Sequence, residues 1–403
     1  MEKILAVAAL ALFLCRPAVA TTARELRELR GSAFKAYQGK DWPAFFEAQK
    51  RVVQAARIPR ELYQLACAAA LAGDKSAALR ALEDFADQDT FLDAANDGDL
   101  ASLRGEPRYE KALRRIAYSR AARGTTPTAA ELPRADLVVE DLARSGQDWF
   151  LSSVRKRAIF KLSRGSLIEL ARTPWAALGM ALEPATNTLW VTTAALDEEE
   201  DHDKADQGRS AILEIDAATG AVKARHDSPA KGALADLRVF DGAAYASDGF
   251  GGGVYRVTSK GFEKLSDDFA SPQTPAMHGG ELLVPDYTLG LAVLDLGTRK
   301  VRWLEAPKGF PLTGIDGTAL AGDDLYIVQN GLDPVRVVKL TLDRRNRIVK
   351  AALVQKGGDL PDPTHAVIHD GALWFIARSG WQGFGKNGFQ PGPPPLLKRV
   401  PLR

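Results

Sequence analysis

The chain has 403 residues, 46% of them hydrophobic, which is enough apolar material for large cores that need no cross-links. Its 53 basic and 51 acidic side chains nearly balance, so the positive surface that binds phosphates is missing and no nucleic-acid partner is expected. Because one core rarely serves more than about 250 residues, we expect two domains.

Residues 1–20 have the pattern of a signal peptide. Lys3 precedes an apolar run over residues 4–15, and small alanine side chains stand at positions 18 and 20, as signal peptidase requires. Cleavage near Ala20 predicts a periplasmic or secreted protein. The apolar run is shorter than the roughly 20 residues that span a bilayer, and no later segment reaches that length, so no transmembrane segment is expected.

Residues 21–122 are predicted to be helical, because apolar side chains recur there every three or four positions. Pro43 and Pro59 stand where helices begin, and Gly39 and Gly73 stand where helices end. The two glycines are 34 residues apart, which is the period of a tetratricopeptide repeat. This segment resembles the tetratricopeptide-repeat family, with residues 63–74 as its best stretch.

The resemblance implies two repeats and a capping helix that ends near Tyr118. A solenoid this short is marginal, because each repeat needs a neighbour to bury its apolar face. We therefore expect the helices either to pack against the second domain or to present a groove to a partner. Cys67 is the only cysteine outside the signal peptide, so we expect a buried thiol without a disulfide.

Residues 123–135 are predicted to be a linker, because Gly124 and the Thr/Pro/Ala-rich stretch after it break the helical period. Residues 136–403 have the pattern of short strands. One module recurs there about every 45 residues, each copy centred on an aromatic residue or a leucine. The six centres are Trp149, Trp190, Tyr245, Leu283, Tyr326 and Trp374.

Six modules of that length predict a six-bladed β-propeller with four strands in each blade. A doubly wound α/β fold is excluded, because no segment with helical period separates the strands. A β-sandwich is the structural alternative, and the near-regular spacing favours the propeller over it. The predicted fold class is therefore a multidomain α and all-β chain, with repeat-like helices followed by a six-bladed propeller.

Three segments of the second domain carry a family resemblance, namely residues 152–160, 247–257 and 315–328. They resemble blades of the senescence-marker protein and gluconolactonase superfamily, with its NHL-repeat relatives. In the lactonases of that superfamily, a divalent metal, usually calcium, lies in the mouth of the channel and is held by Glu, Asn and Asp side chains. The resemblance implies a hydrolase in which the metal polarises the lactone carbonyl and an acidic residue directs water.

Carried over by position, Glu140 in the first blade and Asp316 in the fifth match the acidic ligands of that family. The asparagine positions do not match, because the third blade has Asp236 and the fourth has Gln273. The first blade also has Asp141 where the family usually has glycine. The metal ligands expected in this chain are therefore Glu140, Asp236 and Asp316, and either Asp141 or Asp316 would direct water.

The starts of the inner strands converge on the channel mouth in any propeller, which adds Gln273 and His365 to the group. Converging carboxylates raise one another's pKa or recruit a cation. The alternative is that each polar side chain caps its strand or bonds to the backbone of a neighbouring blade. We expect Gln273 and His365 to bind a ligand at the mouth, together with Trp381 and Phe384 on the Gly/Pro-rich loop 380–395.

The acidic segment 197–206 lies in the longest insertion between two strands. It contains many oxygen ligands but lacks the spacing of an EF-hand, so it is predicted to be a solvated loop.

Two functions follow from these observations. The first is an exported propeller that binds an unidentified small molecule or protein, with the helical repeats as a second interaction surface. The second is a hydrolase of lactones or related esters, with a divalent metal such as calcium as cofactor. The hydrolase needs carboxylate oxygens within about 2.3–2.6 Å of one cation, whereas the binder needs no such convergence. The sequence by itself specifies neither a certain cofactor nor an oligomeric state.

Overall fold

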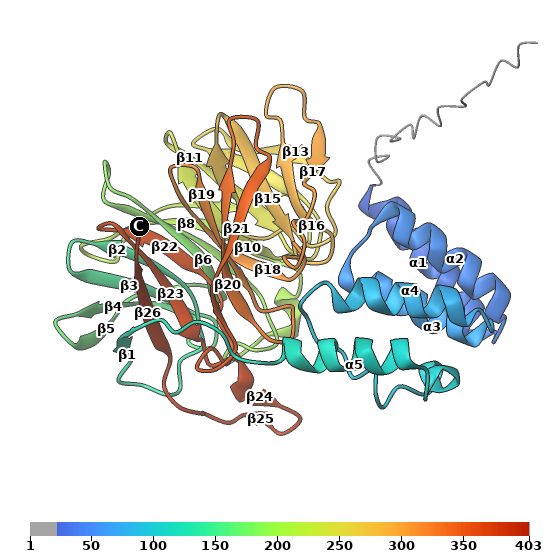
Figure 1. The fold of residues 1–403 in the computed structure, drawn as a ribbon. Coiled ribbons are helices and arrows are strands. Elements are labelled where there is room, and N and C mark those ends of the chain that lie inside the picture. The colour runs from blue at the N-terminus through green and yellow to red at the C-terminus, as the bar shows by residue number, and fades with distance from the viewer. Residues whose placement is uncertain (1–21, 403) are drawn as a thin grey trace, which may run out of the picture.

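The computed structural model describes residues 22–402, so the signal peptide predicted over residues 1–20 lies outside the described residues. A helical domain comes first and a ring of β-sheets follows it (Figure 1). The ring consists of six four-stranded sheets, which confirms the predicted α and all-β class and the six-bladed propeller. Within the described part of the chain, every helix is too short or too polar to span a bilayer.

The helical domain consists of two helical hairpins and a capping helix. Its elements are α1 (Ala23–Gln38), α2 (Trp42–Ala55), α3 (Pro59–Leu71), α4 (Lys75–Ala86), the 3₁₀ helix η1 (Gly98–Leu103) and α5 (Pro107–Ser119). Asp41 and Asp74 cap α2 and α4 by accepting from backbone N–H groups three residues on. Pro43 and Pro59 lie in the first turns of α2 and α3, as the sequence indicated. The assignment of this helical domain to the tetratricopeptide-repeat family stays a prediction.

The first three blades each contain four consecutive antiparallel strands, ordered from the channel outward. Blade 1 has β2 (Val139–Ser145), β3 (Asp148–Ser153), β4 (Ala158–Ser163) and β5 (Ser166–Arg172). Blade 2 has β6 (Ala176–Glu183), β7 (Thr188–Ala194), β8 (Ser210–Asp216) and β9 (Val222–Asp227). Blade 3 has β10 (Leu234–Phe240), β11 (Ala243–Asp248), β12 (Val254–Thr258) and β13 (Gly261–Ser266).

The next two blades repeat this order. Blade 4 has β14 (Ala276–His278), β15 (Glu281–Asp286), β16 (Gly290–Leu294) and β17 (Val301–Trp303). Blade 5 has β18 (Ile315–Ala321), β19 (Asp324–Gln329), β20 (Arg336–Leu342) and β21 (Ile348–Lys356). All six sequence centres, from Trp149 to Trp374, lie in the second strand of their blades, which explains why the module was visible in the sequence.

Blade 6 closes the ring with strands from both ends of the propeller. Its inner strands are β22 (Ala366–His369) and β23 (Ala372–Arg378), followed by β26 (Leu396–Pro401) and then β1 (Thr128–Glu131). The range 123–135, expected to be a linker, therefore contains a strand that pairs with β26. Sequence periodicity did not identify β1, because a four-residue strand with mostly exposed side chains leaves no alternating pattern.

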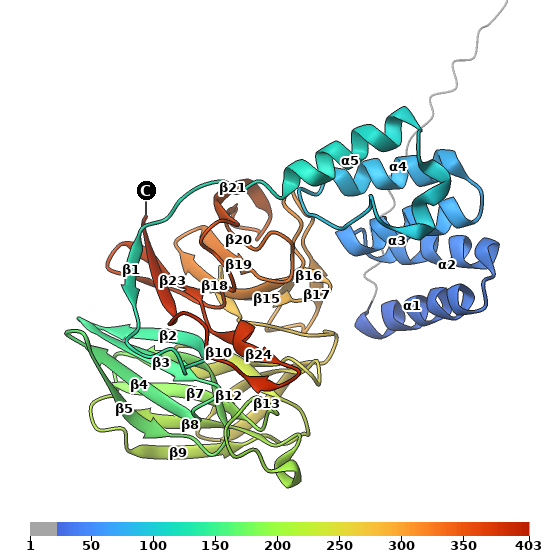
Figure 2. The same cartoon turned by 90° about the horizontal axis from the view of Figure 1, so that it is seen from below.

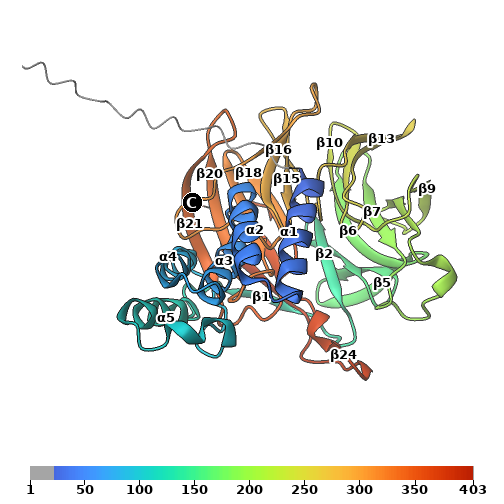
Figure 3. The same ribbon diagram turned by 90° about the vertical axis from the view of Figure 1, so that its right-hand side faces the viewer.

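The helical domain packs against blades 4 and 5, as the views in Figures 2 and 3 agree. Asp89, in the segment between α4 and η1, lies between three cations of the propeller side. Its carboxylate accepts from Arg123 and, at 2.9 Å, from Lys356, and its backbone carbonyl accepts from Arg336. Leu289, between β15 and β16, packs on the apolar cluster of α1 and α2. These contacts match the expectation that a short solenoid needs a neighbour.

Replacing Asp89 by asparagine is expected to lower the free energy of unfolding by about 3 kcal/mol, because a buried lysine and arginine would lose the charge between them. Urea denaturation followed by tryptophan fluorescence measures this change. The control is Asp84→Asn, which breaks an exposed pair with Arg57 and should cost less than about 1 kcal/mol. Equal effects of the two substitutions would contradict a special role for Asp89.

Candidate functional site

Four acidic side chains and one histidine meet at one mouth of the channel, where the inner strands begin. Glu140 and Asp141 lie on β2, Asp236 on β10 and Asp316 on β18, while His365 directly precedes β22. The strands come this close because Asp316 is followed by Gly317, where a Cβ would lie 2.7 Å from the Cα of His365. The predicted convergence of these five residues is therefore found in the structure.

His365 lies between two carboxylates and is 1% exposed. Its Nε2 is 2.8 Å from Oδ1 of Asp236, and its Nδ1 is 3.3 Å from Oδ2 of Asp141. Burial alone would lower the pKa of His365, but the two carboxylates outweigh burial and raise that pKa well above the usual value. The ring is therefore an imidazolium that neutralises two acids.

Asp141 is fully buried, and hydrogen-bond donors occupy both of its oxygens. Oδ1 accepts from the N–H of Leu142, and Oδ2 accepts from the N–H of Met180 and from Nη1 of Arg238, each at 2.8 Å. Burial acts to raise the pKa of Asp141, but the charges of Arg238 and His365 lower it to about 2. The geometry makes Asp141 an anchor for these two cations, which leaves it no free oxygen with which to direct water.

Arg238 lies across the channel and contacts four blades. From β10 in blade 3 its guanidinium reaches Asp141 in blade 1, and it also donates to the carbonyl oxygens of Met180 in blade 2 and Ala366 in blade 6. Asp236 likewise serves the network, because its Oδ1 accepts from the hydroxyl of Thr274 at 2.6 Å and contacts His365. Asp236 is thus a partner of His365 instead of a member of the cation-binding group described next.

Glu140, Asp316 and His365 form the group whose geometry suits a cation. Each offers one ligand atom, and these atoms all lie within 4.8 Å of one another. Burial raises the pKa of Glu140 to about 8, with the charge of Asp316 adding to the effect. Burial also raises the pKa of Asp316 to about 6, against the opposing charge of His365. Two desolvated carboxyl groups therefore face each other at the mouth.

Two neighbours orient these carboxyl groups. The indole Nε1 of Trp381 donates to Glu140 at 2.5 Å, and the amide Nδ2 of Asn330 donates to Asp316 at 2.6 Å. The amide oxygen Oδ1 of Asn330 is buried and has no hydrogen-bond partner among the described residues. An unsatisfied buried amide oxygen, on a side chain that bonds to Asp316, is the donor chemistry that calcium or magnesium takes.

The four residues predicted to bind a ligand have different surroundings. Trp381 donates to Glu140 and its ring packs against Phe384, which in turn packs against Phe389 in the hairpin of β24 (Phe384–Gly385) and β25 (Gly388–Phe389). The side chain of Gln273 bonds to Ser271 and has no hydrogen bond to the acidic group. His365 is in the centre of the network, too buried for direct contact with a ligand.

The acidic segment 197–206 is tied to the propeller and does not form a free loop. Buried Glu199 accepts from the backbone N–H of Ala176, and Glu200 pairs with Arg155 and Lys156 of the neighbouring blade. These contacts hold the insertion in place, so the prediction of a merely solvated loop was incomplete.

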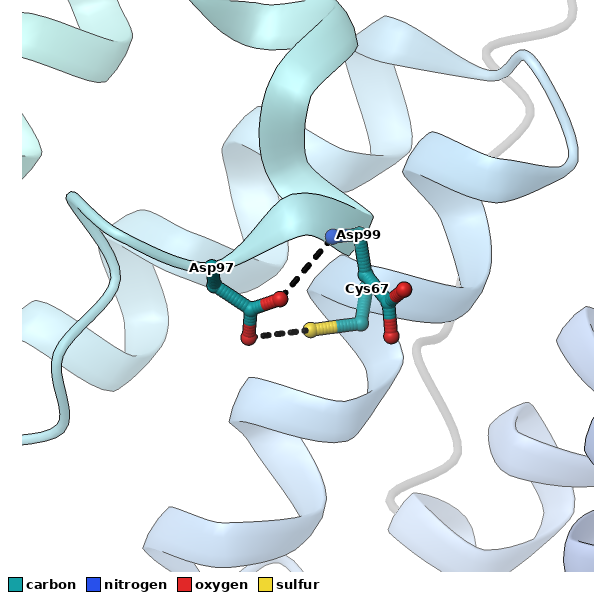
Figure 4. A group of neighbouring side chains, drawn as sticks. All are labelled: Cys67, Asp97 and Asp99. Carbon is teal, nitrogen blue, oxygen red and sulfur yellow. Dashed lines mark hydrogen bonds between the residues drawn. The ribbon is translucent and has the colours of Figure 1, made fainter.

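A second group of possible ligands lies in the helical domain, formed by Cys67, Asp97 and Asp99 (Figure 4). Asp97 accepts from the backbone N–H of Asp99 at 2.9 Å and from the hydroxyl of Tyr63 at 2.6 Å, and the Cys67 sulfur is 3.7 Å from it. Burial, with the charges of both aspartates, raises the pKa of the Cys67 thiol far above its usual value. The thiol stays protonated, and Asp97 acts as the cap of η1.

Sequence reasoning missed Arg238, Asn330 and Thr274. Arg238 is the one basic residue of the inner strand β10, where Asp236 is the one acid and the other residues are apolar, which is a signal for a buried partner. Asn330 directly follows β19, which is the second strand of blade 5 and contains the centre Tyr326 found in the sequence. Thr274 gave no signal, since a threonine beside a strand is common in any β-protein.

No protein-family model and no curated protein matches this chain. Solved structures do match it. The aldose sugar dehydrogenase of Streptomyces coelicolor, in its PQQ-bound form, is 14% identical with a TM-score of 0.50, over 70% of this chain and 99% of that one. This likeness shows the fold alone. The chain carries a six-bladed β-propeller.

Two further structures cover the same part of the chain. A glucose dehydrogenase-type putative oxidoreductase of Thermus thermophilus is 17% identical with a TM-score of 0.49, over 70% of this chain and all (100%) of that one. The calcium-binding protein regucalcin of Agrobacterium tumefaciens is 15% identical with a TM-score of 0.48, over 70% of this chain and 97% of that one.

Replacing Glu140 by glutamine is expected to stabilise the chelator-treated protein at pH 8–9. The raised pKa means that the folded protein binds this proton more tightly than the unfolded chain does, so the wild type loses stability as pH rises from about 4.3 to about 8. The variant has no such loss, and its melting temperature should exceed that of the wild type by at least about 2–4 °C, or about 1 kcal/mol.

Thermal unfolding from pH 5 to pH 9 measures the effect, and the advantage of the variant should shrink toward pH 5. Glu47→Gln on the exposed face of α2 is the matched control and should show no pH-dependent difference from the wild type. A constant difference at every pH would mean that the charge of Glu140 is not destabilising.

Proposed function

We propose that this protein is an exported propeller that binds a divalent cation at the mouth of its channel and uses the cation to hold a small oxygen-containing ligand. The observation that carries the proposal is the convergence of Glu140 and Asp316, whose carboxylate oxygens lie within 4.8 Å of each other and of His365. Two atoms that are each about 2.3–2.6 Å from one calcium ion are separated by no more than about this distance. Export rests on the signal pattern at residues 1–20.

The charge of the site supports a divalent ion. Four carboxylates meet two cations there, so two negative charges are left over when all four acids are ionised. The carboxylates are Glu140, Asp141, Asp236 and Asp316, and the cations are Arg238 and His365. A buried excess of charge is costly unless an ion neutralises it.

The available donors favour a hard cation over zinc. Both nitrogens of His365 face carboxylates, so the imidazolium balances charge and has no lone pair for a metal. The converging donors left are the carboxylate oxygens of Glu140 and Asp316, and the neighbouring Asn330, which bonds to Asp316, adds a buried amide oxygen that has no partner among the described residues. Oxygen ligands of this kind suit calcium or magnesium, which retain waters that a ligand can replace.

The hairpin of β24 and β25, together with Trp381 just before it, is called the aromatic hairpin. Its rings favour a ligand that has an apolar face. Trp381, Phe384 and Phe389 are partly exposed, and Phe384 packs at a tilt against each of the other two rings, with Trp381 bonded to Glu140. A cation on one side and aromatic rings on the other would hold a ligand that has oxygens at one edge and a flat apolar surface. The helical domain offers a separate surface for a protein partner, with Phe34 61% exposed on α1.

Calcium is expected to raise the melting temperature of the chelator-treated wild type, and Asp316→Asn is expected to abolish the rise, because the cation stabilises only the folded protein. Isothermal titration should give one site per chain. The control is Asp197→Asn, which removes an exposed acid of the 197–206 segment and should leave the rise unchanged. No calcium response in the wild type, or a loss of response only in Asp197→Asn, would refute the proposal for the channel mouth.

A second candidate function is hydrolysis of lactones or related esters at the same site. It is favoured because Glu140 and Asp316, the two acids that match the lactonase pattern, are also the two that the structure brings together. A bound cation would polarise the carbonyl of the substrate. The chain itself would then supply Glu140 and Asp316 to hold the cation, and Asp316 would also direct water, because the oxygens of Asp141 are already occupied.

If the protein is a hydrolase, calcium-loaded wild type should cleave simple γ- and δ-lactones, and Asp316→Asn should lower kcat/KM by about 100-fold or more, because the substitution removes a ligand of the cation and the group that directs water. Asp197→Asn should keep full activity. Calcium binding without cleavage of any lactone or aryl ester would dismiss the hydrolase and leave the cation-dependent binder.

A further inference from the structure

The opposite end of the propeller channel holds a cavity that the cation site does not use. Its volume is about 330 Å³, within the range of about 300–1,000 Å³ that small-molecule sites occupy. Arg238 and the network behind it separate this cavity from the mouth that carries Glu140. Most of its lining residues come later in the inner strands than the acids do, so the cavity lies toward the face away from the aromatic hairpin.

Most residues that line the cavity are apolar, and the charged or titratable ones among them are basic. Its apolar side chains come from all six inner strands or the residues beside them, and include Leu142, Leu182, Val239, Met277, Leu320 and Ile368. The charged or titratable side chains that line it are Arg144, Arg238 and His369, and none of the lining residues is acidic. This composition selects a ligand with an apolar body and a negative charge.

Arg144 is the side chain that can receive that charge. Its guanidinium lies 4.5 Å from the ring centres of both Trp149 and Trp374, and its Nε donates to the carbonyl of Gly146. Among the described residues, its two terminal nitrogens have no hydrogen-bond partner and no carboxylate within ion-pair distance. The two indoles pack against each other with ring centres 4.6 Å apart, and the guanidinium lies over both. A guanidinium held on this aromatic surface, with its planar fork free, is preorganised for a carboxylate.

Arg238 cannot play the same part. Its Nη1 already donates to Asp141 and to the carbonyl of Leu237, and the charge of Asp141 neutralises it. Arg238 forms the floor of the cavity, where it meets the apolar end of a ligand. Arg144 at the rim is free to bind a charge, whereas Arg238 at the floor is already neutralised. An amphipathic molecule would therefore enter with its apolar end first.

We propose that this cavity is a second binding site, for a small amphipathic carboxylate whose charged end lies on Arg144 and whose apolar chain lies in the channel. The proposal is independent of the cation site, since the two sites share no side chain that would contact a ligand. A second copy of the chain is the competing occupant, and the test below includes it.

Isothermal titration of the mature protein with decanoate tests the proposal. We expect one decanoate per chain, binding of 1-decanol at least tenfold weaker, and no binding of decylammonium, because only the carboxylate matches the rim. The fluorescence of Trp149 and Trp374 should change on binding. No heat and no fluorescence change up to the solubility limit of decanoate would overturn the proposal.

Arg144→Gln should weaken decanoate binding at least tenfold, to the level of decanol, and Arg144→Lys should have a smaller effect because it keeps the charge without the planar fork. The matched control is Arg399→Gln, since Arg399 also lies over Trp374, at 5.4 Å, but does not line the cavity. Unchanged affinity of Arg144→Gln, or equal losses in both glutamine variants, would contradict the assigned anchor.

Two further measurements separate the alternatives. Asp316→Asn should bind decanoate like the wild type, so a failure of the cation proposal leaves this result intact. Light scattering should give the same mass with and without decanoate. A dimer that dissociates as decanoate binds would assign the cavity to a second copy of the chain and overturn the proposal.

Discussion

The polar centre of the propeller depends on one constraint, which is that acids brought together by converging strands must be neutralised where little water is present. Arg238 and His365 meet this constraint for Asp141 and Asp236. Such buried ion pairs contribute little net stability, because removing the charges from water costs about as much as their attraction returns. Their effect is instead geometric, since each pair joins strands of different blades and fixes how closely the strands approach.

The same constraint separates the four acids into two kinds. Asp141 and Asp236 have protein cations and N–H or O–H donors on their oxygens, so their charges are satisfied within the chain. Glu140 and Asp316 have one neutral donor each and face each other. The second pair is the place where an added positive charge does most to stabilise the folded chain, and it is also the pair nearest the aromatic hairpin.

The fold was largely predictable, because the second strands of the blades contain aromatic residues and leucines at near-regular intervals, and regular spacing is a property of sequence. The convergence of Glu140, Asp236 and Asp316 was predictable for the same reason, since any propeller gathers the starts of its inner strands. The roles within that group were not predictable. They depend on which donor reaches which oxygen, as with Arg238, which crosses the channel from a distant blade.

Gln273 and β1 show two other limits. Gln273 lies at the start of a strand, as the acids do. Its amide nitrogen donates to the backbone carbonyl and the hydroxyl of Ser271 and makes no bond to the acids at the centre. Strand β1 is short and exposed, so its pairing with β26 is decided by the closure of the ring and not by its own residues. Local pattern identifies an element or a position, while long-range pairing decides what that position does.

The turn between β15 and β16 contacts the helical domain and the surroundings of the channel mouth within three residues, from Tyr287 to Leu289. The ring of Tyr287 packs against Gly331, and burial raises its pKa to about 12, with the charges of Asp316 and Glu140 adding to the effect. Two positions later, Leu289 packs into the helices α1 and α2. The turn is therefore held from both sides, by the helices at Leu289 and by the propeller at Tyr287. Because the charges of Asp316 and Glu140 act on the phenol of Tyr287, the segment that fixes the helical domain also belongs to the surroundings of these two acids.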